Sequence, residues 1–203
     1  MQSEIVLATG NAGKVREIQT VLSGYGISVK PQSEFNIPEA DETGLSFVEN
    51  AIIKARNAAQ YTGKPAIADD SGIEVDYLNG EPGIYSSRFA GVDGDSEANN
   101  TKLLQALSGL EQEKRNARFQ CVIVYLKHAK DPTPVICQGT WEGWITDKQS
   151  GANGFGYDPL FFVPTNQCCA AELDSSIKNS ISHRGQALKK LADYFETHPV
   201  REE

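Results

Sequence analysis

The chain of 203 residues contains 39% hydrophobic and 23% charged residues, which is typical of a folded globular protein and excludes a disordered one. Its formal net charge of −8 argues against non-specific binding to nucleic acid, because such binding needs a basic surface, but it allows a basic pocket for a small anion. No apolar run approaches the roughly 20 residues that span a bilayer, so we expect no membrane partner.

The cysteines and the N-terminal residues indicate a cellular compartment. The four cysteines show neither a CxxC spacing nor the density of a disulfide scaffold, so we expect no structural zinc and a reducing environment. Residues 1–4 carry no basic flank and lead into only a short apolar run, so we expect no signal peptide. No repeat or long linker divides the chain. These features predict one domain over residues 1–203, located in the cytoplasm.

The first half of the chain alternates predicted strands and helices. A short buried strand over residues 4–8 is followed by a helix whose apolar residues share one face. A second helix begins at Ser46, which has the spacing of a capping box with Glu49. Residues 65–68 form another buried strand that ends at an acidic turn, and residues 73–77 alternate as a half-exposed strand does.

The second half adds both helices and strands. In order, the pattern predicts a helix over residues 96–107, an antiparallel hairpin of strands near 119–125 and 135–145, a glycine-rich loop at 151–159, a short strand at 160–163, and a last amphipathic helix around residues 188–195. Helices beside both parallel and antiparallel strands define an α/β protein with a mixed sheet.

Residues 9–14, Thr-Gly-Asn-Ala-Gly-Lys, connect the first strand to the first helix. Such a turn places free backbone N–H groups where an anion can bind, and Lys14 adds a positive charge. The segment is not a Walker A loop, because Ala8 stands where that motif needs glycine and Val15 stands where it needs serine or threonine. An ordinary turn with a surface lysine is the alternative interpretation.

Asp69 and Asp70 follow the second buried strand directly. Two neighbouring carboxylates in this position favour a cation beside them, and magnesium prefers such oxygen ligands together with phosphate. Glu42, in an acidic loop at residues 39–44, could add a further carboxylate. The alternative is a solvated acidic turn, but ligands of open α/β sheets gather at the C-terminal ends of strands, which favours a site.

Two later segments carry residues that suit a purine base. Glycines in the loop at 151–159 allow the backbone to approach a ligand, and Phe155 and Tyr157 offer rings for stacking unless they lie in the core. His183 and Arg184 fall in the first turn of the last helix, where positive charge opposes the helix dipole. This conflict indicates a functional demand, such as binding an anion or an acceptor atom, although a surface position is the alternative.

Six segments together resemble the inosine triphosphate pyrophosphatase family. They are TGNAGK (9–14), DETGLSFVENAIIKA (41–55), AIADDSGIEV (66–75), PGIYSSRFAG (82–91), GFGYDPLF (154–161) and SHRGQAL (182–188). The segments occur in the family's order and span nearly the whole chain. The resemblance implies a mixed, strongly twisted sheet with two lobes that enclose a nucleotide cleft, and a homodimer.

The resemblance also implies roles for individual residues. Asp70 would be catalytic, as the general base or as the carboxylate that orients water. The Mg²⁺ ligands would be Asp70, Asp69 and Glu42. The residues that would bind the phosphates are Thr9, Gly10, Asn11, Ala12, Gly13, Lys14 and Lys54. The other substrate-binding residues would be Ser71, Phe155, Gly156, Tyr157, Asp158, Lys178, His183 and Arg184, with the base stacked near Phe155.

The implied activity is hydrolysis of the deaminated purine nucleoside triphosphates ITP, dITP and XTP to the monophosphate and pyrophosphate. This reaction would remove wrong bases from the nucleotide pool before they enter DNA or RNA. A buried donor such as Arg184 would pair with the 6-oxo group of these bases and be left unpaired by adenine. Two alternatives are a phosphotransferase, disfavoured by the missing Walker A and kinase motifs, and a non-hydrolytic purine nucleotide sensor, which would not need the three carboxylates.

Overall fold

The computed structural model describes residues 4–199. Residues 1–3 and 200–203 lie outside the described residues, so the expectation that the N-terminus is no signal peptide stays a prediction. The strands are β1 (Ile5–Leu7), β2 (Val29–Pro31), β3 (Ala66–Val75), β4 (Asn116–Leu126), β5 (Val135–Ile145), β6 (Phe161–Val163) and β7 (Cys168–Cys169). The α-helices are α1 (Ala12–Gly24), α2 (Phe47–Thr62), α3 (Ser96–Ala106), α4 (Ser175–Ile181) and α5 (His183–Thr197). Short 3₁₀ helices are η1 (Gln32–Phe35), η2 (Asp76–Leu78), η3 (Gly83–Arg88), η4 (Gln112–Lys114) and η5 (Ala170–Glu172).

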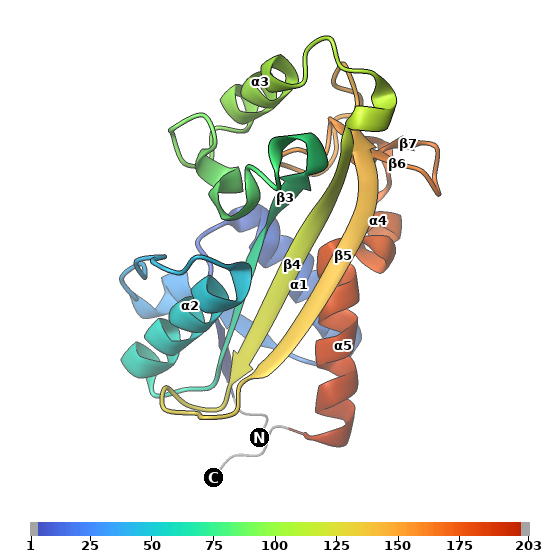
Figure 1. The fold of residues 1–203 in the computed structure, drawn as a ribbon. Coiled ribbons are helices and arrows are strands. Elements are labelled where there is room, and N and C mark those ends of the chain that lie inside the picture. Colours follow the sequence, from blue (N-terminus) through green and yellow to red (C-terminus); the bar gives the residue numbers. More distant parts are fainter. Residues whose placement is uncertain (1–3, 200–203) are drawn as a thin grey trace. The chain divides into compact units, whose positions relative to one another are not determined.

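The strands form one seven-stranded sheet in the order β2-β1-β3-β4-β5-β6-β7 (Figure 1). The strand β1 pairs in parallel with β2 and β3, whereas β6 pairs antiparallel with β5 and β7. Successive strands β4 and β5 are neighbours in the sheet, as expected for a hairpin. The predicted α/β class with a mixed sheet is therefore confirmed.

The chain divides into two compact units. Of the described residues, unit 1 comprises residues 4–70, Cys121–Gly139 and residues 184–199, and unit 2 comprises Ser71–Gln120 and Thr140–His183. Each unit has its own hydrophobic core. One domain over residues 1–203 stays a prediction.

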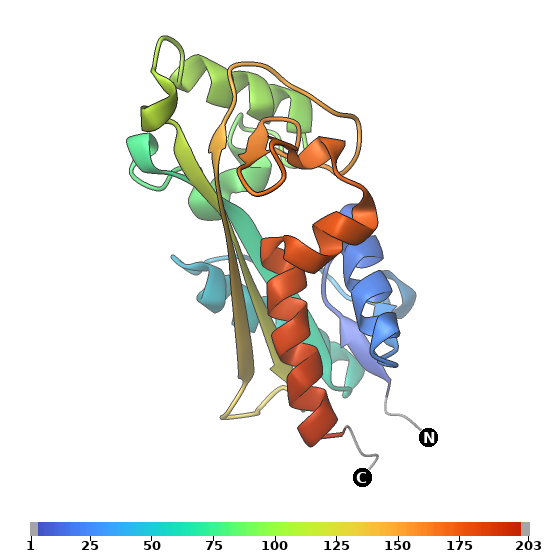
Figure 2. The ribbon, with the colours of Figure 1, turned by 90° about the vertical axis from the view of Figure 1, so that its right-hand side faces the viewer.

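The core of unit 1 has two layers, one on each face of its strands. Ile5 and Leu7 pack with the apolar residues of α1 and α5, whereas the intervening Val6 packs with the alanines of α2. Because successive side chains of a strand point to opposite faces, α1 and α5 cover one face and α2 covers the other (Figures 1 and 2). The apolar faces predicted for these helices are confirmed, with Ile18 and Leu22 buried on α1.

The helix α2 begins where the sequence predicted. Ser46 is its N-cap, and the Ser46 hydroxyl oxygen accepts a hydrogen bond from the Glu49 N–H. The Glu49 carboxylate in turn accepts from the Leu45 N–H at 2.9 Å, which fixes the chain that enters the helix.

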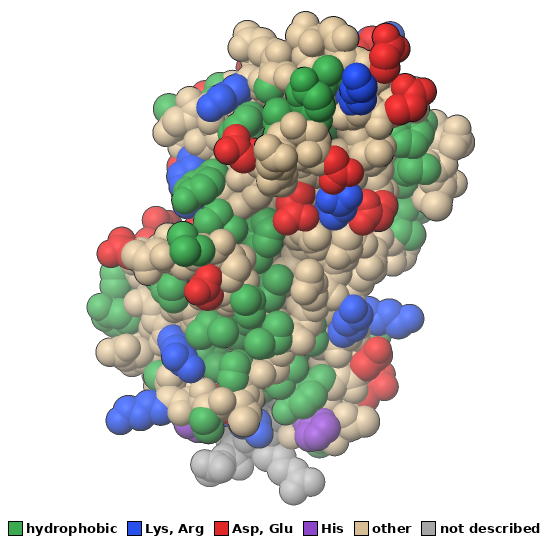
Figure 3. Space-filling view, in the orientation of Figure 1, with side chains coloured by type: hydrophobic (Ala, Val, Ile, Leu, Met, Phe, Trp, Pro, Cys, Tyr) green, Lys and Arg blue, Asp and Glu red, His purple; other side chains and the backbone are tan. Residues whose placement is uncertain are grey.

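In the core of unit 2, apolar side chains from α3 and the residue after it pack against side chains of β3, β4 and β6. Leu103 and Leu107 pack with Ile73, Phe119 and Phe161. On the face drawn in Figure 3, acidic and basic side chains are interspersed. Within unit 2, the half-buried Arg118 donates to both Asp76 and Glu142.

The prediction of a turn at residues 69–72 is wrong, because β3 continues through Asp69 and Asp70 to Val75. Positive side chains neutralise both carboxylates, so the chain need not turn toward water at this point. The neighbouring strand β1 does end here, since its pairing with β3 stops at Leu7 opposite Ile67. Asp69 and Asp70 therefore lie just beyond the C-terminal end of β1, and Tyr77, predicted in a strand, lies in η2.

None of the helices among residues 4–199 combines the length and the apolar character that crossing a membrane requires.

Candidate active site

The loop between β1 and α1 is organised by Asn11, the N-cap of α1. The Asn11 side-chain oxygen accepts hydrogen bonds from the N–H groups of Gly13 at 2.9 Å and Lys14 at 3.1 Å, and the Asn11 N–H donates to the Thr9 hydroxyl at 3.2 Å. These two helix N–H groups are therefore already capped, contrary to the expectation that the turn leaves them free for an anion. The loop also contains Gly10 and Ala12, and it presents Lys14 as its charged group.

Asp69 lies at the centre of a buried chain of alternating charges in unit 1. Its side chain is fully buried, and its Oδ2 atom lies 3.1 Å from the Lys14 ammonium and 3.3 Å from Nη2 of Arg184. The guanidinium of Arg184 also donates to the carboxylate of Glu17 on α1. Charges of both signs can be buried here because each faces an opposite charge.

Asp70 takes part in a second ion cluster, also in unit 1. The Lys54 ammonium, on α2, lies 2.7 Å from Oδ1 of Asp70 and 2.8 Å from Oε1 of Glu42. The structure thus brings together Lys54, Asp70 and Glu42, as the site prediction requires, with the lysine between the two carboxylates.

The two adjacent aspartates differ in acidity. Burial alone would raise the pKa of Asp69, but Lys14, Arg184 and Lys54 outweigh it and hold that pKa well below its ordinary value. For Asp70 burial dominates and raises the pKa, although Lys54 and Lys14 oppose the shift. Burial would lower the pKa of Lys54, but the carboxylates of Asp70, Asp69 and Glu42 raise it. Asp69 is therefore a fixed negative charge, whereas Asp70 holds a proton more readily.

The aspartates retain oxygen atoms that fit a hard cation. Oδ1 of Asp69 and Oδ2 of Asp70 are buried and accept no hydrogen bond from the described residues. Buried carboxylate oxygens without partners suit Mg²⁺, which typically takes one or two carboxylates together with phosphate oxygens and water. Within residues 4–199 no group of three or more His, Cys, Asp or Glu side chains is arranged to hold a metal by itself. The residues thus fit a magnesium site that phosphate completes.

The loop that carries Glu42 is fastened to α2 by Asn50, which is not one of the predicted site residues. Oδ1 of Asn50, which is fully buried, accepts a hydrogen bond from the Gly44 N–H at 2.8 Å. A Cβ atom at Gly44 would lie 2.5 Å from Cβ of Glu49, so only glycine fits there. The segment DETGLSFVEN contained this signal, since a helical asparagine near a glycine turn suggests a side-chain contact to the backbone.

The predicted base-binding residues of unit 2 centre on Asp158. Its Oδ2 atom accepts hydrogen bonds from the Phe155 N–H at 2.8 Å and from the Lys178 ammonium at 2.7 Å. The Lys178 ammonium also lies 4.8 Å from the centroid of the half-buried Phe155 ring. At Gly154, where φ is +74°, a Cβ atom would lie 2.1 Å from Oδ2 of Asp158, so this turn requires glycine.

Tyr157 and His183 lie deeper in unit 2 than their predicted role suggests. The Tyr157 ring belongs to the core, and its hydroxyl donates to the backbone oxygen of Ser86 at 2.8 Å. The His183 ring stacks on Phe119, with centroids 4.7 Å apart and planes within 10°. Ser71, the residue after Asp70, is half-buried. Direct contact of these residues with a base stays a prediction.

Arg184 was predicted to donate to the base. In the structure its guanidinium donates to two carboxylates. Nε and Nη2 face Asp69, and Nη1 faces Glu17. No sequence pattern distinguishes Glu17 from the other polar residues on α1. Donation by Arg184 to a purine stays a prediction.

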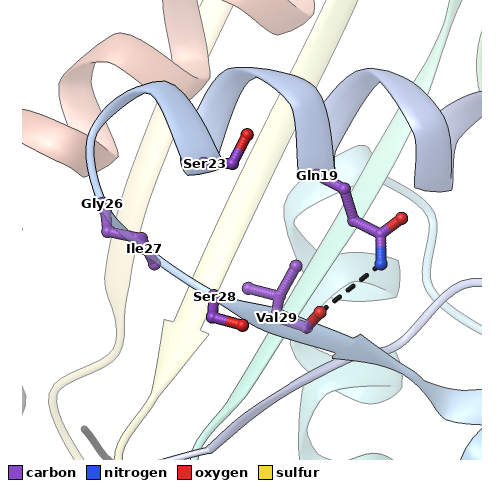
Figure 4. Close-up of a pocket in the computed structure, with 6 residues that line it drawn as sticks. All are labelled: Gln19, Ser23, Gly26, Ile27, Ser28 and Val29. Atoms are coloured by element: carbon purple, nitrogen blue, oxygen red, sulfur yellow. Dashed lines mark hydrogen bonds between the residues drawn. The ribbon is translucent and has the colours of Figure 1, made fainter.

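A separate hollow of about 360 Å³ lies in unit 1, along α1 and the segment that leads into β2 (Figure 4). Its lining consists of Gln19, Ser23, Gly26, Ile27, Ser28 and Val29. Nε2 of Gln19 donates to the backbone oxygen of Val29 at 3.4 Å. None of the predicted site residues lines this hollow.

The fold and the ion clusters define an α/β protein with buried, paired charges just beyond the C-terminal end of a parallel strand, the edge at which open α/β sheets bind ligands. The sequence model of the Ham1 family matches residues 5–194, and the chain belongs to this family. A dITP/XTP pyrophosphatase of Thioalkalivibrio sulfidiphilus is 63% identical over 190 residues, which cover 94% of this chain and 97% of that protein. A dITP/XTP pyrophosphatase of Vibrio cholerae is 59% identical over 188 residues, 93% of this chain and 94% of that protein. A solved HAM1 protein from Coxiella burnetii is 50% identical, with a TM-score of 0.89 over 97% of this chain and all of that one (100%).

Proposed function

We propose that this protein is a nucleoside triphosphate pyrophosphatase that converts dITP, ITP and XTP to the monophosphate and pyrophosphate. Relatives more than half identical over almost the whole chain carry the name dITP/XTP pyrophosphatase. The observation that carries the proposal is the buried Asp70 carboxylate, which binds Lys54 through one oxygen and leaves the other without a partner. Such a group can orient water beside a neutralised phosphate.

The phosphates need positive charge, and unit 1 supplies it. We assign the triphosphate to the loop of Thr9, Gly10, Asn11, Ala12, Gly13 and Lys14, together with Lys54. Lys14 and Lys54 each contact an aspartate and are largely buried, so they are held in place before substrate arrives. Preorganised charge of this kind stabilises the negative charge that develops on the phosphates and on the leaving pyrophosphate.

We assign to Asp70 the role of orienting and deprotonating the reacting water. Its unpartnered Oδ2 accepts a hydrogen bond from the water and takes its proton as the water attacks the α-phosphate, with pyrophosphate as the leaving group. The burial that raises the pKa of Asp70 makes its carboxylate a better proton acceptor. Asp69, whose charge is fixed by Lys14 and Arg184, holds Lys14 beside the site.

Mg²⁺ held by Asp70, with Asp69 and Glu42, would neutralise phosphate charge when bound. The unpartnered Oδ1 of Asp69 is the atom that supports this assignment, because the unpartnered Oδ2 of Asp70 is assigned to the water. Glu42 contacts the Lys54 ammonium, so its direct role is to position that lysine beside the metal.

The base is assigned to the unit 2 residues Ser71, Phe155, Gly156, Tyr157, Asp158, Lys178 and His183, with Arg184 as a donor to the 6-oxo group. The half-buried Phe155 ring offers a stacking surface, and the nearby Lys178 offers a donor. A site built around a donor rejects adenine, whose amino group leaves that donor unpaired. Guanine shares the 6-oxo group, so its exclusion needs a further contact near its 2-amino group.

A panel of triphosphates tests this proposal. The protein is incubated with Mg²⁺ and dITP, ITP, XTP, ATP or GTP, and the released phosphate species is identified for each. We expect pyrophosphate from the first three and rates at least about a hundredfold lower with ATP and GTP. Release of orthophosphate would refute the reaction, comparable rates with ATP would refute the specificity, and binding without turnover would favour the sensor.

We further propose a cytoplasmic homodimer. The homodimer follows from the family resemblance, and the location follows from the cysteine pattern and the N-terminal residues. The four described cysteines form no disulfide, which is compatible with a reducing compartment. Light scattering during size-exclusion chromatography tests the assembly, and a monomer mass would contradict it.

A further inference from the structure

Two adjacent asparagines, Asn99 and Asn100, lie within α3, and each is only 3% exposed. Asparagine is unfavourable inside a helix, because its side chain competes for backbone hydrogen bonds. Two successive buried asparagines are therefore explained by contacts outside the helix. Each side chain makes such a contact, and the two contacts differ.

Asn99 fastens the end of η3 and the segment that follows it. Its Oδ1 accepts from the Ala90 N–H at 2.7 Å, and its Nδ2 donates to the backbone oxygen of Ser87 at 2.9 Å. Both ends of the amide are used, so Asn99 has a complete structural explanation.

Asn100 reaches a different segment, the glycine-rich loop. Its Nδ2 donates to the backbone oxygen of Gly156 at 3.1 Å. Because the backbone oxygen of Gly156 can only accept a hydrogen bond, the side-chain nitrogen of Asn100 must face the loop. The side-chain oxygen Oδ1 therefore points away from it. That oxygen is buried and accepts no hydrogen bond from the described residues. An asparagine kept only for packing would be replaced by leucine without loss, so the donor to Gly156 is the feature that needs asparagine.

The carbonyl of Gly156 is a sensitive point of the loop. Gly154 and Gly156 both adopt positive φ angles, of +74° and +61°, which give this backbone freedom that other residues lack. Gly156 directly follows Phe155, whose N–H is held by Asp158. The bond to Asn100 thus fixes the loop immediately after the ring that is assigned to the base.

We propose that Asn100 is a positioning residue that sets base selectivity by holding the backbone at Gly156, and with it the Phe155 ring beside Lys178. The proposal rests on the proposed function, in which Phe155 stacks on the purine. The Lys178 ammonium contacts both Asp158 and the Phe155 ring, so a shift of the loop changes the relation of ring to donor. Misplacement by about 1 Å can cost roughly a hundredfold in rate.

The test uses the matched variants Asn100→Asp and Asn99→Asp. Both change an amide into a carboxylate of the same shape, on the same helix and at the same exposure, and both place it against a backbone carbonyl. The measurements are kcat and KM for dITP and dATP, the melting temperature, and hydrogen exchange of the backbone amides of residues 151–158. Exchange reports the hold on the loop without any substrate.

We expect Asn100→Asp to lower the ratio of kcat/KM for dITP to that for dATP by about tenfold, mainly through the KM for dITP, and to speed exchange in the loop. Asn99→Asp should lower the melting temperature by a similar amount, keep the selectivity ratio within about twofold and leave exchange in the loop unchanged.

Unchanged exchange in Asn100→Asp would overturn the positioning role, whatever the activity. Faster exchange with an unchanged selectivity ratio, or an equal loss of selectivity in Asn99→Asp, would overturn the link to the base. If Asn100→Asp does not fold, Asn100→Ala takes its place with the same criteria. Wild-type protein that fails to hydrolyse dITP would refute the proposed function instead, and the exchange data would still decide whether Asn100 holds the loop.

Discussion

Replacing each of the two adjacent aspartates by asparagine should separate structure from catalysis. Asp69→Asn removes the charge that faces Lys14 and the buried Arg184, whose side chain is 2% exposed and keeps its contact with Glu17. Asp70→Asn removes a charge that faces Lys54, which keeps Glu42 at 2.8 Å. The first change should therefore destabilise the fold, and the second should chiefly abolish turnover.

The magnitudes follow from burial. Removing one partner of a buried ion pair typically costs 3–5 kcal/mol, and the asparagine oxygen can still accept one bond from Arg184, so we expect a loss of about 3 kcal/mol for Asp69→Asn. For a chain of this size that corresponds to a fall of roughly 6–12 °C in melting temperature. Burial already raises the pKa of Asp70, so its ionised form is not favoured by folding, and Asp70→Asn should change stability by less than about 1 kcal/mol.

Urea unfolding at pH 7, followed by circular dichroism, measures the two stabilities, and steady-state hydrolysis of dITP measures turnover. We expect Asp70→Asn to fold like the wild type and to lose at least about a hundredfold in kcat. Equal destabilisation by the two variants would refute the assignment of Asp69 as the structural charge. An Asp70→Asn protein with wild-type turnover would refute the role of Asp70.

Three further predictions concern pH, a glycine and the metal. The pKa of Asp69 is lower in the folded than in the unfolded chain. The stability that Asp69 contributes should therefore be complete above pH 3.8, the ordinary pKa of the group, and should be lost as the pH falls below that value. Urea unfolding should then show the stabilities of wild type and Asp69→Asn converging in acid. The raised pKa of Asp70 has the opposite sign, so wild type should gain stability relative to Asp70→Asn as the pH falls toward 4. Gly154→Ala should lower stability by about 1–3 kcal/mol and raise the KM for dITP, because its Cβ would meet the Asp158 carboxylate; an unchanged KM would contradict this. Chelation should abolish turnover reversibly without changing the circular dichroism spectrum, and full activity in excess chelator would exclude a required metal.

Much of the fold follows from local patterns in the sequence. The apolar face of α1 and the Ser46 cap of α2 are encoded within a few residues, so helical periodicity and cap chemistry were sufficient to predict them. The prediction for β3 was wrong because Asp69 and Asp70 have the composition of a turn. Their neutralising partners, Lys14 and Arg184 for Asp69 and Lys54 for Asp70, are distant in sequence, and only the folded chain brings them together.

The site shows the same division. Family resemblance placed Lys54, Asp70 and Glu42 in one site, and the structure joins them. It could not reveal that Asn100 holds the glycine-rich loop, because this bond joins residues 56 positions apart in the sequence. The cap of α1 by Asn11 is local, so its signal was present in the sequence and was overlooked. Aromatic rings are equally ambiguous in sequence, since stacking on a base and packing in a core require the same side chain.

Hydrolysis of dITP in isotope-labelled water tests the central claim most directly. The products are separated, and phosphorus NMR with mass spectrometry locates the label. We predict dIMP that carries the labelled oxygen on its phosphate, together with unlabelled pyrophosphate, as attack on the α-phosphate requires. Formation of dIDP and orthophosphate, or label confined to pyrophosphate, would contradict the account.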